Sequence, residues 1–151
     1  MLGEGDKIRY SDATFDVLGP SKSELVDGEL NTTSVVGMLR AGGLRALYTG
    51  DIAANVETRL VRDYDLRAHV LKAPHHGSRF SSSETFLTEI NPAVAIFEGR
   101  EKNRYGHPTK EALDRISNTG AKVFRTDQWG AISVIVSDAK MKISTQKKYE
   151  K

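Results

Sequence analysis

Short apolar segments of strand length alternate with segments of helical spacing along this chain of 151 residues, and that alternation constrains the fold more than any other feature. Helical spacing occurs at 53–62 and 109–118, and a further helix is expected from the segment 81–84 to about residue 90. The segments expected to be strands lie at 8–10, 14–18, 34–40, 44–49, 69–72, 94–97, 122–125, 131–137 and 141–144. Strands that alternate with helices are typical of a sheet with helices packed on it. We therefore predict a single α/β domain over residues 1–151, in which the last two strands complete the sheet and residues 138–151 form a basic tail that is free to fray.

Local signals mark where several of these elements begin and end. Ser81 and Glu84 have the Ser-x-x-Glu spacing of a capping box, which predicts the start of a helix. Pro108 precedes the last predicted helix, and Gly120 follows it as a stop signal. The polar segment at 19–33 is expected to be a loop. The segment at 127–130 is expected to be a turn, in which Trp129 is a packing residue.

The composition excludes several classes of protein. Hydrophobic residues make up 38% of the chain and the net charge is only +2, which favours a folded domain over disorder. No stretch approaches the roughly 20 apolar residues that a transmembrane helix needs. The first 12 residues lack the apolar core of a signal peptide. The absence of cysteine excludes disulfides, thiolate nucleophiles and cysteine-ligated metals.

Polar residues follow three of the predicted strands. Asp51 follows the fourth strand, His75 and His76 follow the fifth, and His107 lies in the segment after the sixth. If these strands run in the same direction, the side chains meet at one edge of the sheet, where α/β proteins bind their ligands. A carboxylate with imidazoles is a ligand set for zinc, manganese or iron. The remaining histidine, His69, begins a strand and is expected to be structural.

Each of these residues also has an alternative role. Asp51 precedes a predicted helix and could be its N-cap. Adjacent histidines in an extended segment point to opposite sides, so only one of them is expected to bind a given metal. A serine hydrolase built from Ser78, a histidine and Asp51 is a further alternative, although the chain has no G-x-S-x-G elbow. Five basic residues near the histidines could either bind phosphates or be ordinary charged residues of exposed loops: Arg79, Arg100, Lys102, Arg104 and Lys110.

Four motifs in this sequence carry a resemblance to a known family. They are YTGD at 48–51, LKAPHHGSR at 71–79 followed closely by three serines, NRYGHP at 103–108 and FRTDQ-x-GAI at 124–132. In their order and spacing they resemble the metallo-β-lactamase-like domain of the ComEC family of DNA-internalisation competence proteins. Asn31 and Ser34 resemble the N-x-x-S segment of that family. The resemblance extends from about residue 5 to residue 136, nearly the whole chain.

The resemblance implies an αββα fold, a binuclear site for zinc or manganese and hydrolysis of phosphodiesters. Asp51 matches the metal-bridging aspartate of the family. His75 matches a histidine ligand that lies late in the family's sequence and completes the metal site. His76 is the less favoured choice for this role. His107 resembles a histidine that touches substrate rather than metal, so the implied catalytic set is Asp51, His75 and His107. The residues expected to bind substrate, implied to be the DNA strand that is not imported, are Asn31, Ser34, Ser78, Arg79, Arg104 and Tyr105.

The main metal motif of the family, H-x-H-x-D-H, does not occur in this sequence. The resemblance therefore implies the C-terminal half of a metallo-β-lactamase αββα sandwich, a mixed sheet with helices packed on it. Asp51 and one histidine supply two ligands, whereas catalytic zinc typically has three from the protein. We therefore expect weak metal binding and little or no hydrolysis by the chain alone.

Two other functions are compatible with the sequence. The chain could be a non-catalytic module that binds DNA or associates with itself, since half a fold exposes an apolar sheet edge or face. It could also hydrolyse another phosphoester. The expected partners are DNA and either an N-terminal half or a second copy of the chain, without membrane contact from this segment. A free-standing chain is expected in the cytoplasm, and a segment of a ComEC-like parent on the extracytoplasmic face of the membrane.

Overall fold

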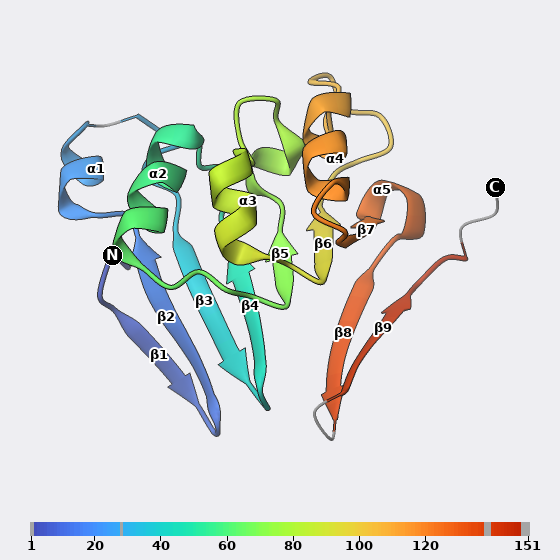
Figure 1. Cartoon of the computed structure of the whole chain (residues 1–151), viewed down its shortest axis with the longest axis horizontal. Helices are drawn as coiled ribbons and strands as arrows, with labels where there is room; N and C mark the ends of the chain where they lie inside the picture. The colour runs from blue at the N-terminus through green and yellow to red at the C-terminus, as the bar shows by residue number, and fades with distance from the viewer. Residues whose placement is uncertain (1, 28, 138–139, 149–151) are drawn as a thin grey trace.

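A seven-stranded mixed sheet forms the centre of the computed structural model, which describes residues 2–27, 29–137 and 140–148 (Figure 1). Its strands are β1 (Lys7–Tyr10), β2 (Ala13–Gly19), β3 (Val36–Ala41), β4 (Leu44–Tyr48), β5 (Val70–Lys72), β6 (Val94–Phe97) and β7 (Lys122–Arg125). The strands lie in the sheet in the order in which they occur in the chain. The first four pair antiparallel, whereas β4 to β7 are parallel.

Three helices cover one face of this sheet (Figure 1). They are α2 (Ala54–Asp63), α3 (Glu84–Ile90) and α4 (Lys110–Ser117). Each lies between two consecutive parallel strands, which need such a crossover connection. Leu60, Phe86 and Ile116 from the helices are buried in one core with Leu47 and Leu71 from the strands. The shorter helices are α1 (Lys22–Asp27), the 3-10 helix η1 (Pro74–Gly77) and α5 (Thr126–Trp129).

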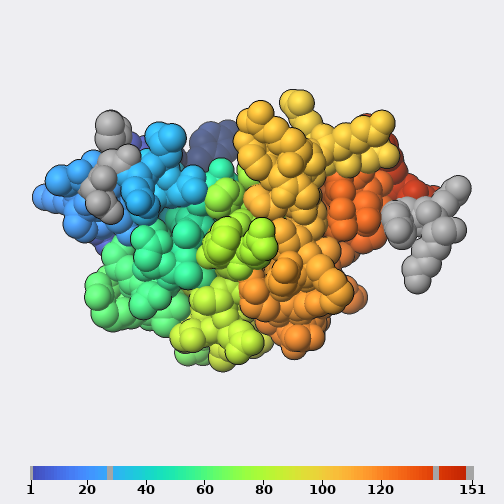
Figure 2. Space-filling model, turned by 90° about the horizontal axis from the view of Figure 1, so that it is seen from above, coloured from blue at the N-terminus to red at the C-terminus, as the bar shows by residue number. Residues whose placement is uncertain are grey.

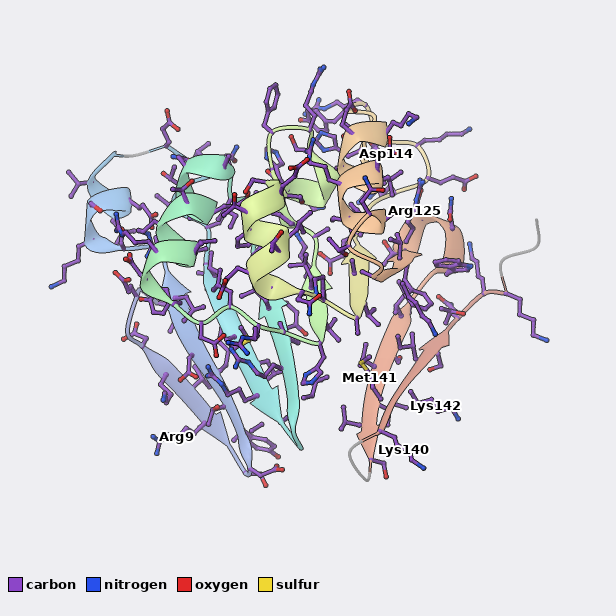
Figure 3. All side chains as sticks on the ribbon, viewed as in Figure 1. Arg9, Asp114, Arg125, Lys140, Met141 and Lys142 are labelled. Carbon is purple, nitrogen blue, oxygen red and sulfur yellow. The ribbon has the colours of Figure 1, made fainter. Side chains whose placement is uncertain are left out.

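A separate hairpin of β8 (Ile132–Ser137) and β9 (Lys140–Thr145) packs on the sheet in a second core. Val134 and Met141 contribute to this core with Val70, which neighbours Leu71 in β5 and therefore points to the face away from the helices. Along β9, Met141 points toward the sheet, whereas Lys140 and Lys142 point away from it (Figure 3). The prediction that the last two strands complete the sheet is wrong. The apolar side of the hairpin packs against the face of the seven-stranded sheet, so the hairpin covers that face and does not extend the sheet at its edge.

The start of α3 differs from the predicted capping box. The N-cap residue Ser83 makes no side-chain capping hydrogen bond, and the Ser81 hydroxyl donates to a backbone carbonyl ahead of α2. The carboxylate of Glu57, on α2, instead accepts hydrogen bonds from the backbone N–H groups of Ser82 and Ser83. A buried carboxylate from the neighbouring helix thus replaces the predicted box.

Two segments expected to be irregular contain helices, since α1 lies within 19–33 and α5 takes the place of the turn. Trp129 packs beside Phe124, with ring centroids 5.1 Å apart. Within the predicted basic tail, residues 140–145 form β9, while 138–139 and 149–151 lie outside the described residues. The single domain over residues 1–151 stays a prediction. None of the helices in the described ranges has the length and apolar character needed to cross a membrane.

Candidate functional site

The carboxyl ends of β4, β5 and β6 lie at one edge of the sheet, and a loop leaves each of them there. The loops after β5 and β6, residues 73–83 and 98–109, lie side by side on the face seen in Figure 2. They are joined directly, because the Gly77 carbonyl accepts hydrogen bonds from the backbone N–H and the hydroxyl of Thr109. The candidate site is built from side chains on these loops.

Asp51 and His76 face each other at this edge. The carboxylate Oδ1 of Asp51 lies 3.5 Å from Nε2 of His76. The other ring nitrogen, Nδ1, lies 2.9 Å from the backbone carbonyl of Glu98. Because a carbonyl oxygen can only accept, Nδ1 donates this hydrogen bond, and in the neutral ring Nε2 presents its lone pair toward Asp51. Histidines that bind metals are commonly oriented in this way by a second hydrogen bond.

His75 has a different neighbour. Its ring packs edge-on against that of His107, with centroids 5.6 Å apart, and its backbone N–H donates to the Gly50 carbonyl. The φ angles of His75 and His76 are 48° and 54°, so this segment is not the extended chain that the prediction assumed. In the left-handed turn it is His76, and not the favoured His75, that faces Asp51.

Asp51 is positioned by its own loop and is not a helix cap. The N-cap of α2 is Ala53, which has no side-chain capping bond, so the alternative role of Asp51 as the N-cap is wrong. The backbone N–H of Asp51 donates to the hydroxyl of Ser34 at 3.1 Å. A Cβ at position 50 would lie 2.7 Å from the Cβ of Ser34, so this close approach requires Gly50. Ser34 therefore acts here by holding the loop that carries Asp51.

His107 is fixed by the side chain of Asn103. The Asn103 amide accepts from the backbone N–H of His107 at 2.9 Å and donates to its carbonyl at 2.6 Å. The Tyr105 ring stacks beside the imidazole, with centroids 6.0 Å apart. Burial lowers the pKa of His107, and positive charge on His75 and His76 lowers the pKa further. The neutral imidazole is therefore favoured, and it retains one N–H that can donate to an anionic oxygen.

Lys72, at the end of β5, lies beneath the Asp51 loop with its side chain 12% exposed. Its Nζ donates to the Gly50 carbonyl at 3.3 Å and lies 3.9 Å from the carboxylate of Glu98. Burial lowers the pKa of the Lys72 ammonium, whereas the charges of Glu98 and Asp51 act in the opposite direction. Lys72 also lines a cavity of about 400 Å³ between the sheet and β8, whose other walls are largely apolar.

The remaining predicted substrate residues occupy different surroundings. Ser78 is buried and its hydroxyl accepts from the backbone N–H two residues later, which does not support the serine-hydrolase alternative. Asn31 is exposed, and its carbonyl accepts from the N–H of Ser34 in the segment that holds the Asp51 loop. Arg79 and Arg104 are exposed, and each guanidinium lies over the aromatic ring of the next residue.

Three residues of this site are missing from the sequence predictions: Lys72, Glu98 and Asn103. Asn103 and Lys72 lie inside the quoted motifs, so those motifs could have indicated both as site residues. Glu98 acts on His76 through its backbone carbonyl, which no side-chain pattern can indicate.

The described part of the chain does not supply a complete metal centre. Within it, no group of three or more histidine, aspartate or glutamate side chains is arranged to hold a metal ion. Catalytic zinc typically takes three protein ligands. The donor set therefore fits only part of a metal site, to which Asp51 and His76 contribute two suitably oriented donors. A cavity of about 520 Å³ opens beside them and is lined by residues that include His76, Arg100, Asn103, Tyr105 and His107.

A solved structure shares this fold. It is a protein of Parabacteroides distasonis ATCC 8503 named as a metal-dependent hydrolase, which superposes with a TM-score of 0.54 at 13% sequence identity. The likeness covers 83% of this chain and 56% of that chain. The predicted class, a mixed sheet with helices packed on it, is confirmed.

The sequence is similar to segments of competence proteins. It is 33% identical over 129 residues to ComE operon protein 3 of Bacillus subtilis and 36% identical over 126 residues to Competence protein ComA of Neisseria gonorrhoeae. It is also 30% identical over 120 residues to Recombination protein 2 of Haemophilus influenzae. The matches cover 85%, 82% and 80% of this chain but 16%, 18% and 15% of those proteins. No protein-family model matches the chain. The chain is thus a homologue of one segment of each of these proteins, which confirms the resemblance predicted from the motifs.

Proposed function

We propose that the chain is one part of a metal-dependent phosphodiesterase that acts in DNA uptake, and that it contributes Asp51 and His76 as metal ligands. The observation that carries the proposal is the orientation of His76, which is anchored through Nδ1 and presents Nε2 to the Asp51 carboxylate at 3.5 Å. The names of the relatives support the role in competence, and the name of the structural neighbour supports metal-dependent hydrolysis.

The implied cofactor is a divalent metal, zinc or manganese. Since the described residues supply only two suitable donors, the other ligands would come from a separate polypeptide segment that carries the H-x-H-x-D-H motif. The chain alone is therefore expected to bind metal weakly and to hydrolyse little or no phosphodiester.

DNA is the proposed substrate. His107 lines the cavity beside the Asp51–His76 pair, where its N–H can donate to an anionic phosphate oxygen. Arg100 lines the same cavity, and Arg104 is exposed beside it next to Tyr105. Guanidinium groups bind phosphates through paired N–H donors, so this rim suits a phosphodiester backbone.

Titration of the 151-residue chain with zinc and manganese tests the ligand assignment. Asp51→Ala and His76→Ala are expected to abolish the weak binding, because each removes one of two donors. His75→Ala is the matched control, since its ring faces His107, and it is expected to retain metal. Loss of metal in His75→Ala with retention in His76→Ala would reverse the assignment. Metal-dependent DNA cleavage by the chain alone that disappears in Asp51→Ala would show that the site is complete without a partner.

A protein partner also belongs to the proposal. The face of the sheet away from the helices keeps a largely apolar cavity beside β8, lined by residues that include Leu39, Leu44, Ile96 and Val134. An N-terminal half of the fold or a second copy of the chain is the proposed partner, and gel filtration with and without an N-terminal-half polypeptide separates the two. If the two polypeptides form a complex that cleaves neither DNA nor another phosphoester, a non-catalytic DNA-binding module becomes the better proposal.

The proposed location depends on whether the chain is a segment of a longer ComEC-like protein. As a segment of a ComEC-like parent the chain would lie on the extracytoplasmic face of the membrane, without contacting the membrane itself. As a free-standing chain it would be cytoplasmic.

A further inference from the structure

The loop that follows the paired histidines is held by two charged side chains that the proposed function does not use. Arg115, on α4, donates hydrogen bonds of 2.8–3.0 Å to the backbone carbonyls of residues 79, 81 and 82. From the other side, the fully buried carboxylate of Glu57, on α2, accepts from the backbone N–H groups of residues 82 and 83. Residues 79–83, called here the Phe80 loop, are therefore fixed from two helices.

The backbone of this loop is also strained. Ser82 has a φ of 63°, a left-handed conformation that a residue other than glycine keeps only where its surroundings impose it. Ser81 and Ser82 are both buried, so the loop is packed as well as hydrogen-bonded. The fold thus specifies one conformation for the residues next to Phe80.

Phe80 itself points its ring at solvent, with 70% of the residue exposed. The guanidinium of Arg79 lies over the ring, 5.4 Å from its centroid. Aromatic side chains stabilise a fold through the apolar area that they bury, and this ring buries little. An exposed ring on a fixed loop is suited to binding, because little conformational freedom is lost when a ligand packs against it.

A second aromatic–guanidinium pair lies on the adjoining loop. Tyr105 is 66% exposed, and the guanidinium of Arg104 lies 4.9 Å from its ring centroid. Tyr105 stacks beside His107. The loop that carries this pair is hydrogen-bonded at Thr109 to the Gly77 carbonyl, three residues before Phe80, so the two pairs lie on loops that are joined at the candidate site.

We infer that Phe80 is a stacking platform for an unpaired base of single-stranded DNA that crosses this site from the Phe80 loop toward Tyr105, an inference that rests on the proposed function. The base would lie on the ring face that Arg79 leaves free, while the N–H groups of Arg79 and Arg104 bind phosphates along the strand. Stacking on aromatic rings is tolerant of sequence. In a duplex each base face is covered by its neighbour, so this contact selects an unpaired strand.

Fluorescence anisotropy in EDTA tests the inference with two labelled probes: a thymidine oligonucleotide of about 12 nucleotides and an abasic strand of the same length, which keeps the phosphates but has no bases. Phe80→Ala is expected to weaken binding of the thymidine strand about tenfold and to leave binding of the abasic strand unchanged. Phe80→Trp, which restores a ring, is expected to bind the thymidine strand as the unmodified chain does. A blunt-ended duplex without a loop is expected to bind equally to all three proteins.

Tyr10→Ala is the matched control, because Tyr10 is an exposed aromatic residue on β1, at the edge of the sheet, and is 83% exposed. It is expected to bind both probes as the unmodified chain does, and the melting temperature of each variant shows that it is folded. The inference is overturned if Phe80→Ala binds the thymidine strand normally, if it weakens both probes equally, or if the unmodified chain binds neither probe. Because EDTA removes the metal, binding of both probes is measured without any metal chemistry, so failure of the proposed metal ligands is seen separately in the zinc and manganese titration.

Discussion

Gly77 lies where the loops after β5 and β6 touch, and the contact leaves no room for a side chain. Its φ is 87°, and a Cβ at this position would lie 2.6 Å from Pro108 and 2.7 Å from Phe97. We expect Gly77→Ala to lower the free energy of unfolding by about 2–4 kcal/mol, because the methyl group clashes and the left-handed conformation is strained. Urea unfolding followed by circular dichroism measures the change.

Gly99→Ala is the control for this prediction. No heavy atom lies within 4 Å of a Cβ built at Gly99, so we expect a change within about 0.5 kcal/mol. Equal stability of the two variants would show that the loops can move apart without cost.

The paired histidines mark a limit of prediction at the residue scale. In the sequence, the ends of the predicted strands indicate Asp51, His75, His76 and His107 as site residues. The structure places these residues at one edge of the sheet. The choice between the two adjacent imidazoles depends on positive φ angles at both positions. Residues other than glycine rarely adopt such angles, so an extended backbone is the natural assumption from the sequence, and it does not indicate which of the two rings lies beside Asp51.

At the scale of elements, the start of α3 depends on a side chain of α2. We expect Glu57→Ala to lower the free energy of unfolding by about 3 kcal/mol, because it leaves two backbone N–H groups without their acceptor in a buried site. Thermal and urea unfolding provide the measurement. Glu84→Ala, which removes an exposed acid from the first turn of α3, is the control and is expected to cost less than about 1 kcal/mol. Equal losses would mean that the Glu57 carboxylate contributes no more than ordinary helix-end charge.

The elements themselves were largely predictable, because runs of apolar residues mark the strands and apolar spacing marks the three main helices. What the sequence did not reveal is how elements share polar groups. The Ser-x-x-Glu pattern at 81–84 has the spacing of a capping box, but its backbone N–H groups are taken by Glu57 from 25 residues earlier in the chain. The prediction that β8 and β9 complete the main sheet was wrong for a similar reason. The sequence pattern of a strand does not indicate which sheet the strand joins.

At the scale of the whole molecule, Arg59 joins three parts of the chain. Its guanidinium donates to the carboxylates of Glu24, on α1, and Glu4, in the N-terminal segment, and to the carbonyl of Leu18, at the end of β2. Burial raises the pKa of Glu24, but hydrogen bonds from Arg59 and from the Ser21 backbone outweigh it and hold the pKa below 4.5. This ion pair therefore links stability to pH.

Because the pKa of Glu24 is lower in the folded chain than in the unfolded chain, the pair stabilises the fold above about pH 4.5, and the stabilisation is lost as the pH falls through the folded pKa. We expect the free energy of unfolding to fall more steeply below about pH 4.5 in the unmodified chain than in Glu24→Gln. Urea unfolding at a series of pH values measures both slopes. Glu101→Gln, on an exposed loop, is expected to keep the steeper slope, and parallel curves for Glu24→Gln and the unmodified chain would contradict the assignment.

The agreement between strand order and chain order has a consequence for how the protein is made. Each strand from β2 to β7 pairs with the strand that precedes it in the sequence, so its docking edge already exists when it leaves the ribosome. Pairing between consecutive strands keeps the loops that must close short, and short loops close at low entropic cost and favour fast folding. The sheet can therefore assemble one strand at a time during synthesis, with α2, α3 and α4 packing in turn on the face of the strands that have just paired.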